Sequence, residues 1–320
     1  MAKNAPGKHY RQGLTLAALF DMFPDDRAAE AWFAAQRWPD GPSCPHCGHD
    51  DVQTGCAHKT MPYRCRRNGC RKRFSVKVGT VMEASNIGCR LWAVAVYLVL
   101  TNLKGISSMK LHRDLGVTQP TAWFMLHRIR EAWAHTAGEP FAGPVEADET
   151  YVGGKAKNMH QRDRERRITG RGGADKAIVV GVLDRATNTV VAGPVADTTA
   201  RTLTGIVDSV TADGADVFTD GHRSYKPLAS LGYAHAAVAH SAREFVRGPV
   251  HTNGIESLWS MFKRGYVGTY HRMSEVHLGR YVNEFTGRHN VREMGTERQM
   301  GTVVVDMVGK RLRYDDLIAA

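Results

Sequence analysis

The sequence lacks any apolar segment long enough to cross a lipid bilayer. Its longest apolar run, LWAVAVYLVL, is about half as long as a transmembrane helix requires and predicts a buried helix instead. The N-terminal segment MAKNAPGKHYRQG also lacks the apolar core of a secretory signal peptide. We therefore expect no membrane partner and a cytoplasmic location.

Cysteine is scarce, and no internal repeat is present. Six cysteines in 320 residues, without a secretory signal, argue against a disulfide scaffold and for reduced thiols. This length allows a well-buried core divided between two or three domains.

Acidic residues are outnumbered by basic ones. The chain has 43 Lys and Arg against 32 Asp and Glu, a net charge of +11. The excess is concentrated in CRRNGCRKRF and in KAKNMHQRDRERRITGRGG, residues 155–173. Such clusters are often only solvated faces, but these two flank candidate functional elements. We therefore favour binding to a polyanion.

Four of the cysteines form two closely spaced pairs. Cys44 and Cys47 lie in a C-x-x-C segment, and a looser pair follows about twenty residues later. That pair is Cys65 and Cys70. Two such pairs on hairpin turns are typical of a zinc ribbon, in which four thiolates hold a structural Zn²⁺.

The spacing within the second cysteine pair is wider than this pattern requires. Asn68 and Gly69 add length before Cys70, so Cys56 or His58 are alternative fourth ligands. A packed hairpin with unmetallated thiols is the competing interpretation.

Several helices are predicted before residue 140. Residues 14–38 predict helix with a break at Pro24, and residues 88–104 predict another helix. Between residues 105 and 133, Gly116 separates a short helix from a longer one that Thr118 caps.

This pattern indicates a helix-turn-helix, with an ordinary helical hairpin as the alternative. The expected exposed, DNA-contacting side chains of the second helix are Gln119, Thr121, Arg128 and Arg130.

From Gly143 onward the sequence favours strands. VEADETYVGG, AIVVGVLDRATNTVVAGPVAD and ADVFTDG are rich in β-branched residues, and TNT suggests a hairpin turn. Helices near 199–211, 224–231 and 253–265 alternate with the later strands. The pattern predicts a mixed α/β sheet rather than a barrel.

Three carboxylates stand at the edges of these segments. Asp148 and Asp220 lie at the ends of predicted strands, and Glu256 lies on the amphipathic helix within HTNGIESLWSMFKRG. Three carboxylates on a rigid frame in a basic protein suggest a site for two Mg²⁺ or Mn²⁺ ions facing a phosphate backbone.

Helical spacing places further polar groups beside Glu256. Asn253, Glu256, Ser260 and Lys263 are separated by three, four and three residues and share one face. Lys263 is two turns beyond Glu256, where we expect it to hold a phosphate.

Each of these groups also has a simpler interpretation. An aspartate at a strand end is most often a turn former or a cap, and Glu256 and Lys263 are compatible with a solvated helix face. Glu146 and Glu149 compete with Asp148 for the first position. Further candidate ligands or bases, each more often structural, are His222, His240 and His251.

The order of these motifs resembles a known family. The two cysteine pairs and the helix-turn-helix are followed by DETYVGGK, TDGHRSY, HTNGIESLWSMFKRGYVGTYH and RYVNEFTGRHNVR. This order resembles the DDE transposases of bacterial insertion sequences, specifically the zinc-ribbon-bearing, ISXO-like group. The resemblance extends over nearly the whole chain from about Leu16.

The resemblance implies an RNase H-like catalytic domain, Mg²⁺ or Mn²⁺, and DNA cleavage and strand transfer without a covalent protein intermediate. It implies Asp148, Asp220 and Glu256 as the catalytic carboxylates and Lys263 as the basic residue that follows. An asparagine is sometimes cited at the third position of this group. Asn253 is therefore the alternative, and we favour Glu256 because a carboxylate binds the ion better than an amide.

The implied partners are double-stranded DNA, as the element's terminal repeats and the target, and further copies of the chain assembled on DNA. A nucleoid-associated location follows.

Segment 155–173 has no counterpart in the family pattern. It is interpreted either as a DNA clamp near the active site or as a loop. The expected domains are N-terminal helices (1–40), zinc ribbon (41–80), helix-turn-helix region (86–136), catalytic domain (143–295) and C-terminal helical tail (296–320).

Two other functions compete with transposition. A transcription regulator with a zinc ribbon and a helix-turn-helix would bind DNA without using the three carboxylates. An RNase H-like nuclease would cut DNA without joining it.

Overall fold

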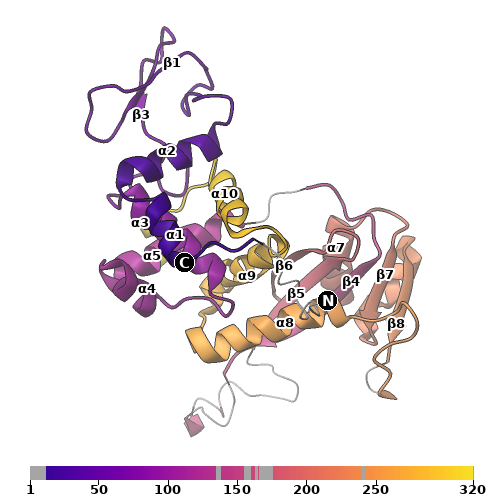
Figure 1. Cartoon of the computed structure of the whole chain (residues 1–320). Helices are drawn as coiled ribbons and strands as arrows, with labels where there is room; N and C mark the ends of the chain where they lie inside the picture. Colours follow the sequence, from indigo (N-terminus) through magenta and orange to yellow (C-terminus); the bar gives the residue numbers. More distant parts are fainter. Residues whose placement is uncertain are drawn as a thin grey trace, which may run out of the picture. The chain divides into compact units, whose positions relative to one another are not determined.

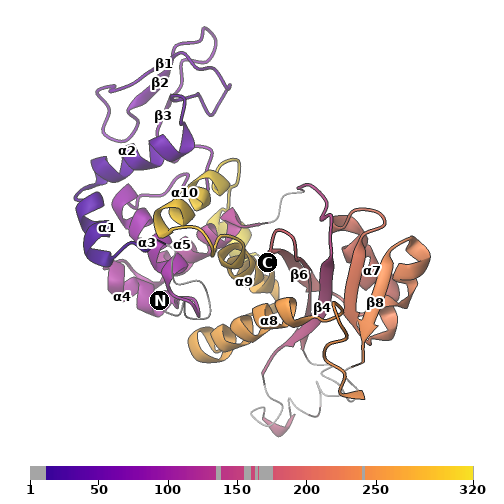
Figure 2. The same ribbon diagram turned by 45° about the vertical axis from the view of Figure 1, so that its right-hand side comes forward.

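The computed structural model describes residues 12–134, 138–154, 160–162, 165, 176–239 and 242–319. Most of segment 155–173, and His240, lie outside these described residues. The chain divides into two compact units (Figures 1 and 2). Unit 1 comprises Met1–Ala134 and Val291–Ala320, and unit 2 comprises His135–Asn290.

Unit 1 is largely helical. Asp25 caps the helix that follows the predicted break at Pro24, because its side chain accepts a hydrogen bond from the N–H of Ala28. The helices of unit 1 are α1 (Leu16–Met22), α2 (Asp26–Arg37), α3 (Cys89–Thr101), α4 (Ser108–Leu115), α5 (Gln119–Ala132), α10 (Thr296–Asp306) and α11 (Tyr314–Ile318).

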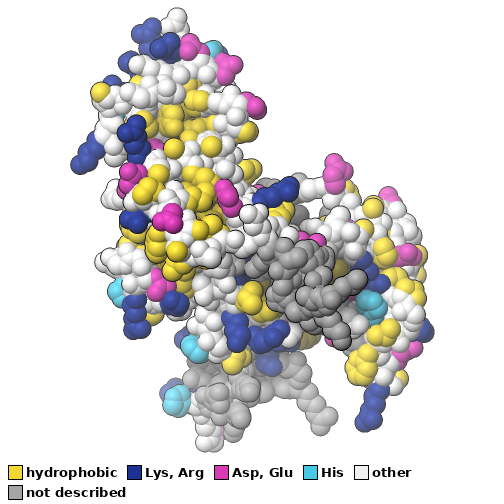
Figure 3. Space-filling view, in the orientation of Figure 1, with side chains coloured by type: hydrophobic (Ala, Val, Ile, Leu, Met, Phe, Trp, Pro, Cys, Tyr) yellow, Lys and Arg dark blue, Asp and Glu magenta, His cyan; other side chains and the backbone are white. Residues whose placement is uncertain are grey.

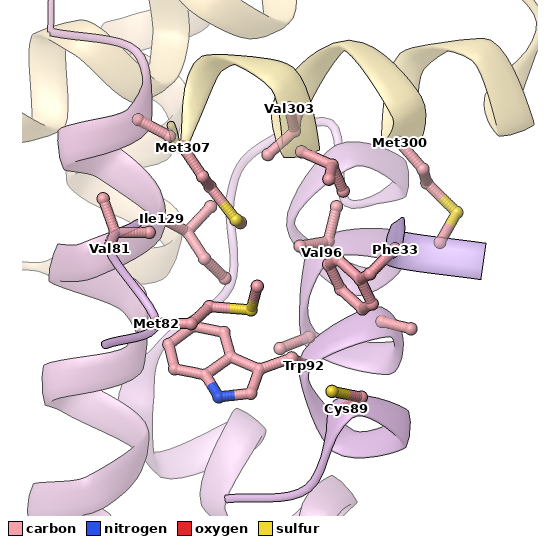
Figure 4. Packing of buried hydrophobic residues seen from close by; sticks show 14 of the residues in the cluster. Phe33, Val81, Met82, Cys89, Trp92, Val96, Ile129, Met300, Val303 and Met307 are labelled. Atoms are coloured by element: carbon pink, nitrogen blue, oxygen red, sulfur yellow. The ribbon is translucent and has the colours of Figure 1, made fainter. Parts of the chain in front are cut away.

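The core of unit 1 joins segments from both ends of the chain. Figure 4 shows Met300 and Val303 of α10 beside Val96 of α3, in the same cluster as the buried Trp92 and Ile129. Residues that the sequence presents as a C-terminal tail thus fill part of the core of unit 1.

A small three-stranded sheet carries the cysteine pairs. Its antiparallel strands β1 (Val52–Gln53), β2 (Tyr63–Cys65) and β3 (Arg73–Phe74) lie in that order. The Arg37 guanidinium at the end of α2 donates to the carbonyls of Val76 and Val78 at 2.6 and 2.7 Å. Trp38 packs edge-on against Tyr63 and Phe74. These contacts fix the ribbon to the helix before it.

Helices α4 and α5 are the two helices predicted on either side of Gly116. Gly116 adopts a left-handed conformation at φ 66°, and the Thr118 side chain caps α5. The predicted exposure of Arg128 and Arg130 is wrong, because their exposed fractions are 7% and 1%.

Arg128 is buried because the C-terminal segment packs over it. Its guanidinium lies 4.2 Å from the ring centroid of Phe124 and donates to the carbonyl of Leu312. Arg130 is buried because α5 packs against α3, α4 and α10, which encloses its C-terminal half.

Unit 2 is built on a five-stranded mixed sheet in the order β6-β5-β4-β7-β8 (Figure 2). β5 runs antiparallel to β4 and β6, whereas β7 runs parallel to β4 and β8. The predicted hairpin joins β5 and β6, with Asn188 at φ 58° in its turn. The strands are β4 (Val145–Val152), β5 (Ala177–Asp184), β6 (Thr189–Val195), β7 (Asp216–Asp220) and β8 (Ala234–Val238).

Helices cover both faces of this sheet. Helix α7 (Ala200–Val210) and the 3-10 helix η2 (Arg223–Leu231) contribute to a core with Val145 and Ala147. Helices α8 (Asn253–Gly265) and α9 (Glu275–Asn290) cover the opposite face, and a short π-helix, η4 (Tyr266–Tyr270), lies between them in sequence. Side chains alternate along β4, so Glu146 and Asp148 lie on the α8 face.

Candidate metal centres and active site

The four paired cysteines converge in unit 1. One Sγ atom from each lies within 4.8 Å of the others, and the Cys44–Cys70 and Cys47–Cys65 separations are 3.8 and 3.7 Å. Zinc–sulfur bonds of about 2.3 Å give a tetrahedron with edges of about 3.8 Å, so the group fits Zn²⁺. Cys70 therefore completes the set.

The two alternative ligands make other contacts. The Cys56 thiol points to the carbonyl oxygen of Gln53, and Nδ1 of His58 accepts from the N–H groups of Thr60 and Met61. Neither belongs to the four-cysteine group.

The backbone around the cysteines also suits a metal-bound thiolate. Hydrogen bonding from the backbone N–H of His49 lowers the pKa of Cys47 to about 6. Burial raises the pKa of Cys65 to about 12, so this thiol needs a cation to hold its deprotonated form at neutral pH.

A second candidate centre lies in unit 2, where β7 ends beside the middle of β4. The prediction that Asp148 stands at a strand end is wrong, because antiparallel pairing with β5 continues β4 to Val152. Ala147 of β4 is paired with Thr219 of β7, which places Asp148 and Asp220 at the same level. One carboxylate oxygen from each of Asp148, Glu149 and Asp220 lies within 4.8 Å of the others. Such a group of hard oxygen ligands suits a divalent cation.

The clustering is visible in the electrostatics of Asp148. Burial, followed by the charges of Glu149, Asp220 and Glu256, raises the pKa of Asp148 to about 8. A bound cation would favour the ionised form and relieve this repulsion.

Glu149 belongs to this cluster although it lies on the other face of β4. Its carboxylate accepts a hydrogen bond from the buried Tyr225 hydroxyl at 3.1 Å. Burial and the charge of Asp220 raise its pKa, and the charge of His222 opposes them. Because Asp220 is the last residue of β7, its carboxylate lies where the strand ends and interacts with both neighbours.

Glu256 lies beside this group rather than within it. Among the described residues, the oxygens found within 4.8 Å of one another are those of Asp148, Glu149 and Asp220. Glu256 accepts from the Thr252 hydroxyl at 2.7 Å and is close enough for its charge to raise the pKa of Asp148.

Asp148, Glu149 and Glu256 line a cavity of about 630 Å³ that cationic side chains also line. Helix α8 supplies one wall, with Glu256, Ser260 and Lys263 on the face that the helical spacing predicts. Arg264 and Trp259 also line the cavity and were not predicted. Asn253 is the first residue of α8 and is exposed.

Glu146, a competitor for the first position, is occupied by other contacts. Its buried carboxylate accepts from Arg185 Nε at 2.7 Å and from the Ile255 N–H at 3.0 Å. His251 belongs to the same set of contacts, whereas the backbone N–H of His222 donates to Asp220 at 3.0 Å.

The raised pKa of Asp148 predicts pH-dependent cation binding. Below pH 8 a proton must leave Asp148 before it can bind the ion, so affinity for Mn²⁺ should rise by up to about tenfold per pH unit and level off above pH 8. Without metal, unit 2 should lose stability as the pH rises from 3.8 to about 8, because its folded state holds the proton more tightly.

Calorimetric titration with Mn²⁺ at pH 6.5 and pH 8.5 measures this effect. Asp148→Asn, which has no titrating carboxyl at that position, should flatten the pH dependence. Equal affinity of the unaltered protein at both pH values would contradict the prediction.

The predicted DNA-contacting residues that are not buried lie at the start of α5. Gln119 is half-buried and donates to the Ser108 hydroxyl of α4 at 2.8 Å. Thr121 is half-buried in the first turn, where its N–H is capped by Thr118.

No helix in the described part of the chain is both long and apolar enough to cross a membrane.

Comparisons with known proteins agree with this arrangement. Residues 140–290 match the ISXO2-like transposase domain, and residues 24–73 match the transposase zinc-ribbon domain. A protein from Halobacterium salinarum, described as an uncharacterized protein in transposable element ISH50, is 30% identical over 285 residues. That alignment covers 86% of this chain and 95% of the relative. The chain therefore belongs to the family of insertion-sequence transposases that combine a zinc ribbon with an ISXO2-like transposase domain.

Proposed function

We propose that this transposase binds the ends of its element and catalyses metal-dependent DNA cleavage and strand transfer at the carboxylate site of unit 2. The observation that carries the proposal is the convergence of Asp148 and Asp220 beside a cavity that also contains Glu256 and Lys263. A transcription regulator would not need these carboxylates close together. Their proximity is unfavourable without a cation, because burial and the neighbouring charges raise the pKa of Asp148.

The acidic and the basic side chains of the site have different proposed roles. Asp148, Asp220 and Glu256 would hold the cations, with Glu149 as a fourth carboxylate near the first two. A pair of Mg²⁺ or Mn²⁺ ions would activate the attacking oxygen and stabilise the leaving oxygen of the phosphodiester. Lys263 and Arg264, on the same cavity wall, bind and orient the phosphate backbone.

The domain architecture supports the same proposal. A mixed sheet with one antiparallel strand beside a central strand, and helices on both faces, is consistent with an RNase H-like catalytic domain. Assembly of several copies on DNA is proposed from the family alone.

We also propose that both parts of unit 1 contact DNA. Helix α5 presents Gln119 and Thr121 near its start, a position suited to contacting base edges. The ribbon presents a basic surface, visible as Lys and Arg side chains over the zinc-ribbon end of unit 1 in Figure 3.

The strand register of the ribbon favours contact with phosphate. Arg64 and Arg73 are exposed and directly opposite each other, which disfavours the sheet unless an anion lies between them. The sequence has no acidic residue from position 52 to position 82. The other exposed cations in this basic run are Arg66, Arg67, Arg71 and Lys72.

Replacing Arg64 and Arg73 together by alanine should weaken DNA binding and its salt dependence. Losing two phosphate contacts should make the plot of log binding constant against log salt concentration less steep, by about 2 in slope. Filter binding to one duplex between low and moderate salt measures the slope. Arg27→Ala with Arg201→Ala removes the same charge from exposed sites elsewhere and should leave it unchanged. An equal change in both double variants would mean that only net charge matters.

The test of the proposed function is a cleavage assay. Purified protein with Mg²⁺ or Mn²⁺ should cut a duplex carrying an element end and join the cut end to a second duplex. A chelator should abolish both steps. Cutting without joining would favour a nuclease, and binding without cutting would favour a regulator.

A further inference from the structure

Helix α8, which carries Glu256, begins without a cap from its own sequence. The side chain of its N-cap residue, Thr252, makes no capping hydrogen bond, and its hydroxyl donates to Glu256 instead. The first N–H groups of a helix need acceptors, and the positive end of the helix dipole favours a negative charge there.

A residue distant in sequence supplies this cap. Oε2 of Glu146 accepts from the N–H of Ile255, in the first turn of α8, at 3.0 Å. Glu146 lies on β4, two residues before Asp148 and on the same face of the strand. One side chain therefore connects the strand of the first carboxylate to the helix of the third.

Two further residues hold Glu146 and the entry to α8 together. Arg185 donates from Nε to Glu146, from Nη1 to the carbonyl of Pro249 and from Nη2 to the carbonyl of His251, at 2.7, 2.6 and 2.7 Å. Arg185 Nη2 also lies 2.8 Å from Nδ1 of His251. Because arginine can only donate, this Nδ1 is the acceptor.

The packing leaves no room for a side chain at the second residue of α8. A Cβ added to Gly254 would lie 2.9 Å from Oε2 of Glu146 and 3.2 Å from Leu183. The glycine is needed here for close approach of the helix to the carboxylate.

We propose that Glu146, Arg185 and His251 form a positioning cluster that sets where Glu256 lies relative to Asp148 and Asp220, and thereby tunes cation affinity. This inference rests on the proposed function, because it assumes that the carboxylates hold a divalent cation. Glu146 acts through the start of α8 and not as a ligand. The alternative is a buried ion pair that contributes only to stability.

Glu146→Gln tests the proposal in the full-length protein. The amide keeps one acceptor oxygen but loses the charge at the helix end, so the first turn of α8 should shift and loosen. Mn²⁺ affinity, measured from the electron paramagnetic resonance signal of free Mn²⁺, should fall roughly 10-fold or more, as expected for outer-shell partners. Amide exchange at Ile255 should accelerate.

Glu284→Gln is the matched control. Glu284 is buried in α9 and pairs with the Tyr270 hydroxyl at 2.7 Å and with Arg288 at 3.5 Å. Its variant should lower the melting temperature without changing Mn²⁺ affinity. If both glutamine variants lowered affinity equally, or if Glu146→Gln left it unchanged, the cluster would be merely structural and the proposal wrong.

A glycine pair provides a second test that does not alter the cluster's charges. Gly254→Ala presses on Glu146 and should weaken Mn²⁺ binding, whereas Gly205→Ala in α7 has open space around it and should leave binding unchanged. Equal Mn²⁺ affinity in the two variants would overturn the proposal.

If the proposed function itself were wrong, the Mn²⁺ titrations would give a different result. In that case Asp148→Asn and Asp220→Asn would bind Mn²⁺ as well as the unaltered protein, whatever the behaviour of Glu146→Gln.

Discussion

Asp220→Asn is expected to reduce DNA cleavage by a factor of roughly a thousand or more while leaving DNA binding intact. The amide has the size of the carboxylate but no charge, and it is a poor ligand for Mg²⁺. Metal ions contribute several kcal/mol of transition-state stabilisation, and about 1.4 kcal/mol corresponds to a tenfold change in rate. DNA affinity measured without metal should not change, because the proposed DNA-binding elements of unit 1 and the cavity cations Lys263 and Arg264 are all retained.

The measurement is single-turnover cleavage of a labelled duplex, with binding followed separately in chelator. Asp216→Asn is the matched control, since Asp216 is the exposed first residue of the strand that Asp220 ends. Its cleavage rate should equal that of the unaltered protein. Normal cleavage by Asp220→Asn would remove the assignment of the active site.

The same assay decides which residue completes the metal site. Glu149 and Glu256 both line the cavity, but only Glu149 has an oxygen within 4.8 Å of those of Asp148 and Asp220 among the described residues. We expect Glu256→Gln to lose more activity than Glu149→Gln, because Glu256 shares a helix face and a cavity wall with Lys263, whereas Glu149 projects from the face of β4 that packs on Tyr225. The opposite order would assign the third role to Glu149.

Removal of zinc is the second change with a large expected effect. Structural zinc sites contribute roughly 10 to 16 kcal/mol of apparent binding free energy, which is folding free energy for a small ribbon. The ribbon has a three-stranded sheet of very short strands, so chelation or Cys70→Ser should unfold residues 44–75. Unit 2 should stay folded, and binding to specific DNA should weaken.

Hydrogen exchange over residues 44–75, together with the zinc content per chain, measures this effect. Cys56→Ser is the control, because Cys56 lies outside the four-cysteine group, and it should keep one zinc per chain. A ribbon that kept both its exchange protection and its DNA affinity after chelation would contradict the prediction.

Local patterns allowed much of the fold to be predicted. Thr118 caps the helix that it was expected to cap, and Asp25 caps the helix that begins after the predicted break at Pro24, because a cap depends on residues only three positions apart. The hairpin of β5 and β6 follows from its turn residues. The convergence of Asp148 and Asp220 was predicted, but it depends on the register of two parallel strands, in which the end of β7 lies beside the middle of β4.

Long-range packing could not be predicted in the same way. Nothing near Arg128 in sequence indicates that Leu312 will cover it, and charge alone suggested an exposed side chain. The face alternation of β4 placed Glu149 away from Asp148, but the position of Asp220 at a strand end brings all three together. The signal for Glu149 was the adjacent pair of acids in DET.

Unit 2 is continuous in sequence, whereas unit 1 is interrupted by it. During synthesis, residues 135–290 leave the ribosome before α10 does, so the carboxylate-bearing sheet can fold while the helical core still lacks Met300 and Val303. The part proposed to recognise DNA is thus completed last, after the part proposed to cut it. A released chain that ends at residue 290 should therefore hold a folded carboxylate-bearing unit and a helical unit whose core is incomplete.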